Sequence, residues 1–163
     1  MKKILIIFAL LGSLTVVQAQ SSFEANLDGL QVLPPNVSPA FGLGDFSLSG
    51  TTLSVTTGTY QDLLGTSTAV TLHDAAPGVN GPVIFLLTLD SPGTTTGTFS
   101  GSGALTAGQI VDLDSGNFYV SIHSTVFPGG EIRGQLEPVP EPATMALLGA
   151  GSLALLAMRR RKV

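Results

Sequence analysis

The chain has 163 residues, no cysteine and a net charge of −4. Without cysteine, disulfide cross-links and thiol-based catalysis are excluded. The charge is unevenly distributed, because residues 20–142 hold all eleven acidic residues and one basic residue, Arg133, for a net charge of −10. A surface of this kind repels phosphate backbones, so we expect no binding to nucleic acid.

Residues 1–19 have the pattern of a secretory signal peptide. Lys2 and Lys3 precede an apolar run at residues 4–17, and Val17-Gln18-Ala19 is a small-residue cleavage site. An apolar run of about 14 residues is short for a membrane span, which favours removal over retention. We therefore expect an exported chain that begins at Gln20.

The next segment, residues 20–137, is predicted to be one all-β domain. Apolar and polar residues alternate at 23–27 and 46–48, and residues 51–60 are rich in Thr with one Val, both β-branched. The continuous apolar run at 83–89 is typical of a strand that is central or buried on both faces.

Clusters of Pro, Gly and Asn at residues 34–36, 76–82 and 91–93 predict turns between these strands. One helix is predicted at residues 106–113, with Thr106 as N-cap and a stop at Ser115-Gly116. Together the signals predict an antiparallel, Greek-key-like β-sandwich of about seven or eight strands with one short helix.

The stretch at residues 119–136, YVSIHSTVFPGGEIRGQL, predicts two strands joined by a Gly-rich turn. In the second strand, Glu131 and Arg133 are two residues apart and share one face. We expect Arg133 to span neighbouring carboxylates and fix the register of this strand, because its planar fork suits bidentate pairing. The alternative is that Arg133 binds an acidic ligand.

This stretch resembles the closing signature of the CHRD (chordin-type) domain, and Phe23, Ala25, Leu27, Gly29, residues 31–35 and Gly42 match the family's opening. The resemblance covers residues 22–137. The signature residues are His123, Pro128, Gly129, Gly130, Glu131 and Arg133. In one place the chain departs from the family pattern, since Thr71-Leu72-His73 stands where the family usually reads His-Ile-His.

Two histidines, His73 and His123, are all the imidazole in the chain. A catalytic zinc usually takes three protein ligands, which these histidines and Glu131 or Asp74 would provide by converging. Because Thr71 replaces a histidine of the family pattern, we expect no metal and no cofactor. His123 is then a strand residue hydrogen-bonded within the sheet, and His73 anchors a turn. The alternative is a metal-binding extracellular protein or metalloenzyme centred on His73 and His123.

Other catalytic patterns are absent from the sequence, so we expect no enzyme and no catalytic residues. There is no Gly-x-Ser-x-Gly elbow, no lysine between residues 20 and 142, and no phosphate-cradling loop. Asp112 and Asp114 are spaced like the two acids of a glycosidase, but their place at a predicted helix end, where carboxylates cap the helix and are solvated, accounts for both residues.

The remaining residues, 138–163, consist of a Pro-rich spacer, an apolar segment at 143–158 and a basic end at 159–162. The apolar segment would form about 24 Å of helix, which snorkelling arginines extend toward the roughly 30 Å of a bilayer core. We expect a transmembrane helix with its basic end in the cytoplasm and the domain outside.

This tail, with Pro140, Glu141 and Pro142 before the apolar segment, resembles the PEP-CTERM sorting signal. The resemblance implies an exosortase-type sorting enzyme as partner, anchoring in the inner membrane before processing, and extracellular polysaccharide as a candidate partner afterwards. The alternative is a permanent C-terminal anchor. We therefore expect a non-enzymatic β-domain that is exported and sorted to the cell surface or extracellular matrix.

Overall fold

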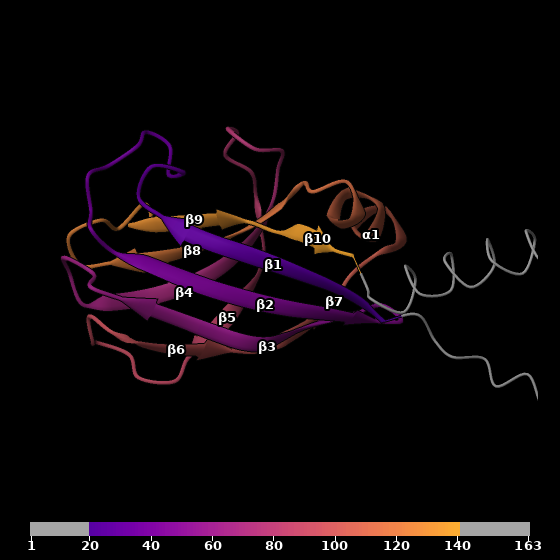
Figure 1. Cartoon of the computed structure of the whole chain (residues 1–163), viewed down its shortest axis with the longest axis horizontal. Helices are drawn as coiled ribbons and strands as arrows, with labels where there is room; N and C mark the ends of the chain where they lie inside the picture. The colour runs from indigo at the N-terminus through magenta and orange to yellow at the C-terminus, as the bar shows by residue number, and fades with distance from the viewer. Residues whose placement is uncertain (1–19, 141–163) are drawn as a thin grey trace, which may run out of the picture.

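The structure is a computed structural model that describes residues 20–140 (Figure 1). The predicted signal peptide at 1–19, Glu141, Pro142, the predicted membrane helix at 143–158 and the basic end at 159–162 lie outside the described residues. The elements are β1 (Ser21–Asp28), β2 (Phe41–Ser49), β3 (Thr52–Gln61), β4 (Ser67–Asp74), β5 (Val83–Leu89), β6 (Gly97–Ser100), β7 (Ser102–Ala104), α1 (Ala107–Asp114), β8 (Phe118–Ser124), β9 (Ile132–Gln135) and β10 (Glu137–Val139). The fold is all-β with one short helix, as predicted.

Eight strands form one closed, barrel-like sheet in the order β1-β2-β3-β6-β5-β4-β8-β9, and every neighbouring pair is antiparallel. Pairing of Asp28 in β1 with Arg133 in β9 closes the circle. The strands predicted to form a β-sandwich thus make one closed sheet, because β1 pairs on both of its edges and leaves no break between two sheets. Closure also removes exposed strand edges.

The Greek-key prediction agrees with the strand order. Hairpins connect β4, β5 and β6, and β3 lies beside β6, which gives the spatial order β3-β6-β5-β4. Residues 20–140 form ten strands rather than about seven or eight. Two of the additional strands, β7 and β10, have three residues each, too few to show an alternating pattern in the sequence.

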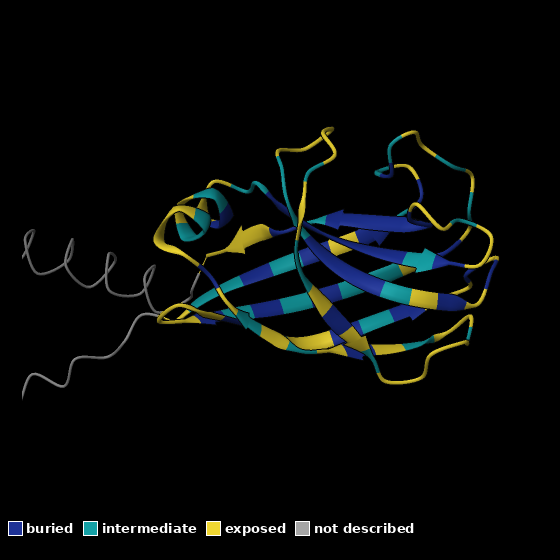
Figure 2. Ribbon diagram, turned by 180° about the vertical axis from the view of Figure 1, so that it is seen from behind, coloured by how far each residue is buried: buried dark blue, intermediate teal, exposed yellow. Residues whose placement is uncertain are grey.

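The inside of the closed sheet holds the hydrophobic core. Side chains of β8 alternate, so that Val120 and Ile122 point inward beside Val70 and Leu72 of β4. Figure 2 shows this interior as dark blue bands along the strands. Each fully buried aliphatic or aromatic side chain contributes about 1.5–3 kcal/mol, so burial of apolar surface stabilises a domain without disulfides.

The apolar strand β5 is central, since it pairs with β4 and β6, but it is not buried on both faces. Leu87 faces the core, whereas the side chain of Leu86 is 70% exposed. The sheet closes around a single core, and among residues 20–140 no second layer covers the outer face of this strand.

The helix α1 lies within one residue of its predicted bounds at each end, and its N-cap is Thr106 as predicted. Thr106 and Gln109 form a reciprocal capping box, with N···O distances of 2.9 and 3.3 Å. Gly116 follows the helix at a positive φ of 74°, and Leu113 anchors the helix in the core. Within residues 20–140, no helix has the length and apolarity needed to cross a membrane.

The first and last strands of the described chain lie side by side. β10 pairs with the start of β1, with Ser22 opposite Val139. The chain therefore enters and leaves the domain at the same end, close to α1 (Figure 1).

Candidate functional site

A group of polar side chains lies on the outer face of β4, β8 and β9. The register places Thr71 beside Ser121 and Ser121 beside Arg133, while His73, Tyr119 and Gln135 form the next row. His123 occupies the row before them, opposite Ala69. We call the following residues the outer polar cluster: Thr71, His73, Tyr119, Ser121, His123, Arg133 and Gln135.

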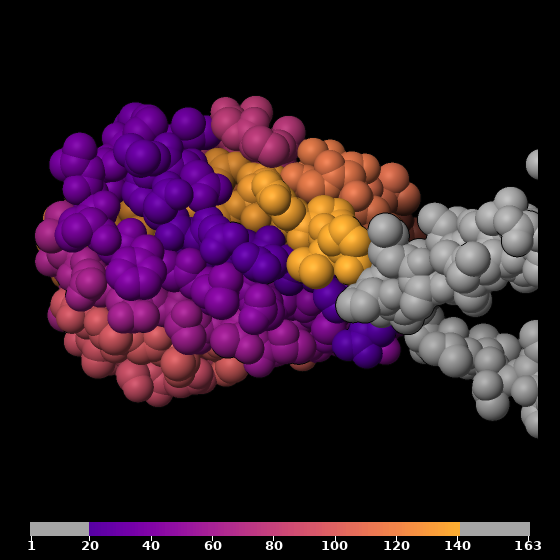
Figure 3. Space-filling model, in the orientation of Figure 1, coloured from indigo at the N-terminus to yellow at the C-terminus, as the bar shows by residue number. Residues whose placement is uncertain are grey.

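Two loop segments cover this cluster. They are the β4–β5 connection at residues 75–82 and residues 31–36 after β1, and the Asn80 amide joins them by donating to the Leu33 carbonyl at 3.3 Å. They stand side by side at the top of the molecule (Figure 3). Under this cover, Arg133 is only 2% exposed although it lies outside the core.

Arg133 holds the β4–β5 connection by donating hydrogen bonds to its backbone. One amino group donates to the Val79 carbonyl at 2.9 Å, and the other donates to the Ala76 carbonyl at 3.5 Å and to Gln135 Oε1 at 3.1 Å. None of these partners is a carboxylate, so the predicted bridge to acidic residues is wrong. Carbonyl oxygens of a loop distant in sequence take that place. Burial lowers the pKa of Arg133, yet a guanidinium stays charged in proteins.

Tyr119 lies between two cationic or cation-forming side chains. The Arg133 guanidinium carbon is 3.4 Å from the centre of the Tyr119 ring, a cation–π contact. On the same tyrosine, the His73 ring stacks at 4.5 Å with the two planes 7° apart. The Gly81 amide donates to the Tyr119 hydroxyl at 3.2 Å, which fastens the covering loop a second time.

The two histidines converge on one hydroxyl group. His73 Nδ1 lies 2.9 Å from the Gly81 carbonyl, and His123 Nδ1 lies 2.9 Å from the Pro128 carbonyl. Their Nε2 atoms lie 2.7 and 2.8 Å from Thr71 Oγ1. Burial lowers the pKa of His73, and the nearby His123 and Arg133 lower it further against the opposing effect of the Gly81 carbonyl. Through its contact with the Gly81 carbonyl, His73 anchors the β4–β5 turn, as predicted.

Glu131 is fully buried and faces other partners. Its carboxylate accepts hydrogen bonds from the amides of Leu64 and Gly65 and from the Ser38 hydroxyl, at 2.5, 3.4 and 2.6 Å. Its backbone carbonyl accepts from the Asn36 amide at 2.9 Å. Glu131 is thus not aligned with the histidines. Among residues 20–140, no group of three or more His, Cys, Asp or Glu side chains is placed to hold a metal.

The turn at Pro128, Gly129 and Gly130 positions these networks. The Pro128 carbonyl fixes the His123 ring, and Gly130 turns the chain into Glu131 with a φ of 122°. A Cβ atom at Gly130 would lie 2.7 Å from Ser121 Oγ, so both the backbone angle and the space require glycine.

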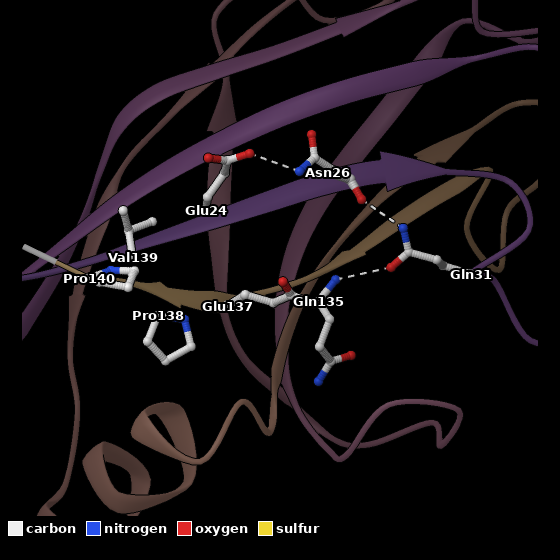
Figure 4. Close-up of a pocket in the computed structure, with 8 residues that line it drawn as sticks. All are labelled: Glu24, Asn26, Gln31, Gln135, Glu137, Pro138, Val139 and Pro140. Carbon is white, nitrogen blue, oxygen red and sulfur yellow. Dashed lines mark hydrogen bonds between the residues drawn. The ribbon is translucent and has the colours of Figure 1, made fainter.

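A shallow groove of about 360 Å³ lies over the adjoining strands β1, β9 and β10 (Figure 4). It is lined by Glu24, Asn26, Gln31, Gln135, Glu137, Pro138, Val139 and Pro140. Glu24 and Glu137 are directly opposite each other in the β1–β10 pair. The sequence did not indicate this groove, because two of the three residues of β10, Pro138 and Val139, fall in the segment assigned to the spacer. Alternation at residues 23–27 was the one available signal, since it places Glu24 and Asn26 on the outer face.

The chemistry of the outer polar cluster is largely internal. Within residues 20–140, every buried side-chain nitrogen or oxygen has a polar neighbour at hydrogen-bond distance. The hydroxyl of Thr71 lies beside two imidazoles, and the residue as a whole is only 6% exposed, which leaves little access for a substrate. The cluster is arranged to hold loops and to present imidazole nitrogens.

Comparison with protein families matches residues 23–136 to the CHRD domain and residues 138–162 to the PEP-CTERM protein-sorting motif. No curated protein and no solved structure matches the chain. The CHRD match covers more than half of the 163 residues and includes the closed sheet and the whole outer polar cluster. The chain therefore belongs to the CHRD domain family and carries a PEP-CTERM protein-sorting motif directly after that domain.

Proposed function

We propose that this protein is an exported, non-enzymatic β-domain that an exosortase-type enzyme sorts to the cell surface or extracellular matrix. The observation that carries the proposal is the sorting-motif match at residues 138–162, because a PEP-CTERM motif is the signal that exosortases recognise. The motif begins within β10 and so follows the folded domain without a long linker.

The geometry of the domain supports this role. The described chain enters at β1 and leaves at β10 on the same end of the domain, so the loops at the other end are far from both of these strand ends. Among residues 20–140, Arg133 is the single basic side chain, and its charge is buried. The exposed surface is therefore acidic, which favours solubility outside the cell.

The non-enzymatic part of the proposal rests on how the outer polar cluster is used. Its arginine, tyrosine and glutamine bind the covering loops, and the Thr71 and Ser121 hydroxyls are buried. These contacts favour an interaction or matrix module over catalysis. The candidate polysaccharide partner belongs to the same proposal.

The test replaces residues 140–142 by alanine in the full chain, in a host with an exosortase-type enzyme. We expect this variant to accumulate uncleaved in the inner membrane, while the wild-type protein outside the cell lacks residues 143–163. Pro138→Ala with Val139→Ala is the matched control and should be processed normally. Mass spectrometry of the membrane and secreted fractions gives the result. Wild-type protein found solely in the membrane with Val163 intact would mean a permanent anchor and refute the proposal.

A further inference from the structure

The imidazole rings of His73 and His123 both direct their Nε2 atom toward the hydroxyl of Thr71. Their Nε2 atoms lie 2.7 and 2.8 Å from Thr71 Oγ1, so the two nitrogens are at most 5.5 Å apart, the sum of these distances. The strand register creates this arrangement, because Thr71 in β4 sits between the rows that carry His73 and His123.

The protons available to these three side chains do not satisfy both nitrogens. Backbone carbonyls only accept, so each Nδ1 must carry the proton that it donates to Gly81 or Pro128. In a neutral imidazole the Nε2 atom is then an acceptor. Thr71 has one hydroxyl proton, and the Ser121 carbonyl also lies within reach of that hydroxyl, at 3.4 Å. The proton is donated to one imidazole at most, which leaves at least one Nε2 lone pair facing an oxygen. A cation at this point, either a proton on one imidazole or a metal ion, would satisfy that lone pair.

We propose that His73 and His123 form a binding site for a divalent transition metal, Cu²⁺ or Zn²⁺, with their Nε2 atoms as ligands. Histidines that bind metals donate their other ring N–H to a carbonyl or carboxylate, and both of these histidines do so. Metal–nitrogen bonds of about 2.0–2.1 Å hold two ligand nitrogens no more than about 4.2 Å apart, so a short approach of the rings suffices.

The donor set decides which ion binds. Imidazole nitrogen suits Cu²⁺, Zn²⁺ and Ni²⁺, whereas Ca²⁺ and Mg²⁺ need several oxygen ligands. Cu²⁺ binds most tightly in the general order of divalent metals. Glu131 is engaged by Ser38, Leu64 and Gly65, so water and the Thr71 hydroxyl complete the coordination. The buried charge of Arg133 behind Tyr119 opposes a second cation, which makes the site weak and metal uptake reversible.

The experiment uses the full chain without an affinity tag, purified in detergent and stripped of metal with a chelator. Titration with Cu²⁺ should give one equivalent bound, and electron paramagnetic resonance should detect two imidazole nitrogens. His73→Ala and His123→Ala should each weaken binding by at least about tenfold, the lower end of the loss seen when even a supporting residue of a metal site is removed. Thr71→Val keeps both imidazoles and should keep the two-nitrogen signal.

A gain-of-ligand variant tests the convergence directly. Thr71→His adds a third imidazole at the meeting point and should produce a three-nitrogen signal and tighter Zn²⁺ binding. Thr68→His, at an exposed position of the same strand, is the matched control and should leave the two-nitrogen signal unchanged. The proposal is overturned if wild-type protein binds Cu²⁺ no better than the His73→Ala/His123→Ala double variant. If the alanine variants do not fold, the wild-type spectrum decides, because absence of imidazole nitrogens overturns the proposal. Sorting of the tail is unaffected by either result.

Discussion

Glu131 and Arg133 carry opposite charges, are two residues apart and are both buried, yet they bind different parts of the chain. Glu131 accepts hydrogen bonds from Ser38 and from the β3–β4 connection at residues 62–66. Arg133 donates to the β4–β5 connection at residues 75–82. Each charge is satisfied mainly by backbone groups of one distant loop. The CHRD signature at these positions thus fastens two loops to the β8–β9 hairpin independently.

The difference between the two networks follows from donor and acceptor chemistry. A carboxylate only accepts, so it collects the N–H groups of a tight connection, whereas a guanidinium only donates, so it collects carbonyl oxygens. The aromatic face of Tyr119 adds a favourable contact for the cation. A direct ion pair between the two would leave both loops without these partners. Pairing is therefore not required to bury either charge.

The largest effect should come from Glu131→Gln. This change turns a charged acceptor into an amide whose NH₂ group opposes the N–H donors of Leu64 or Gly65. Unpaired buried donors are costly, and hydrogen bonds to charged groups are the stronger ones, so we expect a loss of about 3 kcal/mol in the free energy of unfolding. Chemical denaturation of the full chain measures it.

Glu137→Gln is the control for this change, because Glu137 is exposed on β10 and should be replaced with little loss. Equal stability of the Glu131→Gln variant and the wild type would show that the carboxylate is not needed to hold residues 62–66.

A smaller loss is expected for Arg133→Met, about 2 kcal/mol. It removes the cation–π contact with Tyr119 and the hydrogen bonds to Val79 and Ala76, but it leaves carbonyls rather than N–H groups unpaired. Arg133→Lys keeps the charge and loses the planar fork, so its stability should fall between the two. If the lysine variant is no more stable than the methionine variant, a positive charge above the Tyr119 ring contributes nothing to the stability of the domain.

The smallest change in the free energy of unfolding is expected at Asp90, an exposed carboxylate that accepts hydrogen bonds from two neighbouring hydroxyls. Hydrogen bonds from Ser100 and Thr98, each 2.7 Å long, hold the pKa of Asp90 below its ordinary value of 3.8. A lowered folded-state pKa contributes stability that is present above pH 4 and is lost as the pH falls through the folded-state value. Asp90→Asn should therefore be slightly less stable than wild type at pH 7, and this gap should close on acidification. A gap that grows at low pH would contradict the assignment.

Local patterns in the sequence predicted local structure well. Alternation in β8 and the capping residues Thr106 and Gln109 are sufficient for the strand and the helix, because the interactions involved lie within a few residues. The loop partners of Arg133 are 54 and 57 residues away and are backbone carbonyls, which have no sequence signature. For the same reason, the closure of the sheet through Asp28 and Arg133 was not predictable.

The candidate site shows the same limit. The sequence identified His73, His123 and Thr71 as residues of interest, and the histidine roles in the sheet and turn agree with the structure. It did not predict that both Nε2 atoms meet at Thr71, because that depends on the register of β4 against β8. Glu131 was grouped with the histidines by residue type, whereas its burial directs it to the β3–β4 connection.

Hydrogen exchange of the full chain, read by mass spectrometry, tests the independence of the two networks most directly. The amides of Leu64 and Gly65 bond to Glu131, and the Gly81 amide bonds to Tyr119 beneath Arg133. Glu131→Gln should speed exchange at residues 62–66 and leave residues 75–82 protected, and Arg133→Met should do the reverse. Loss of protection in both segments from either single change would contradict the claim that the signature fastens the two loops separately.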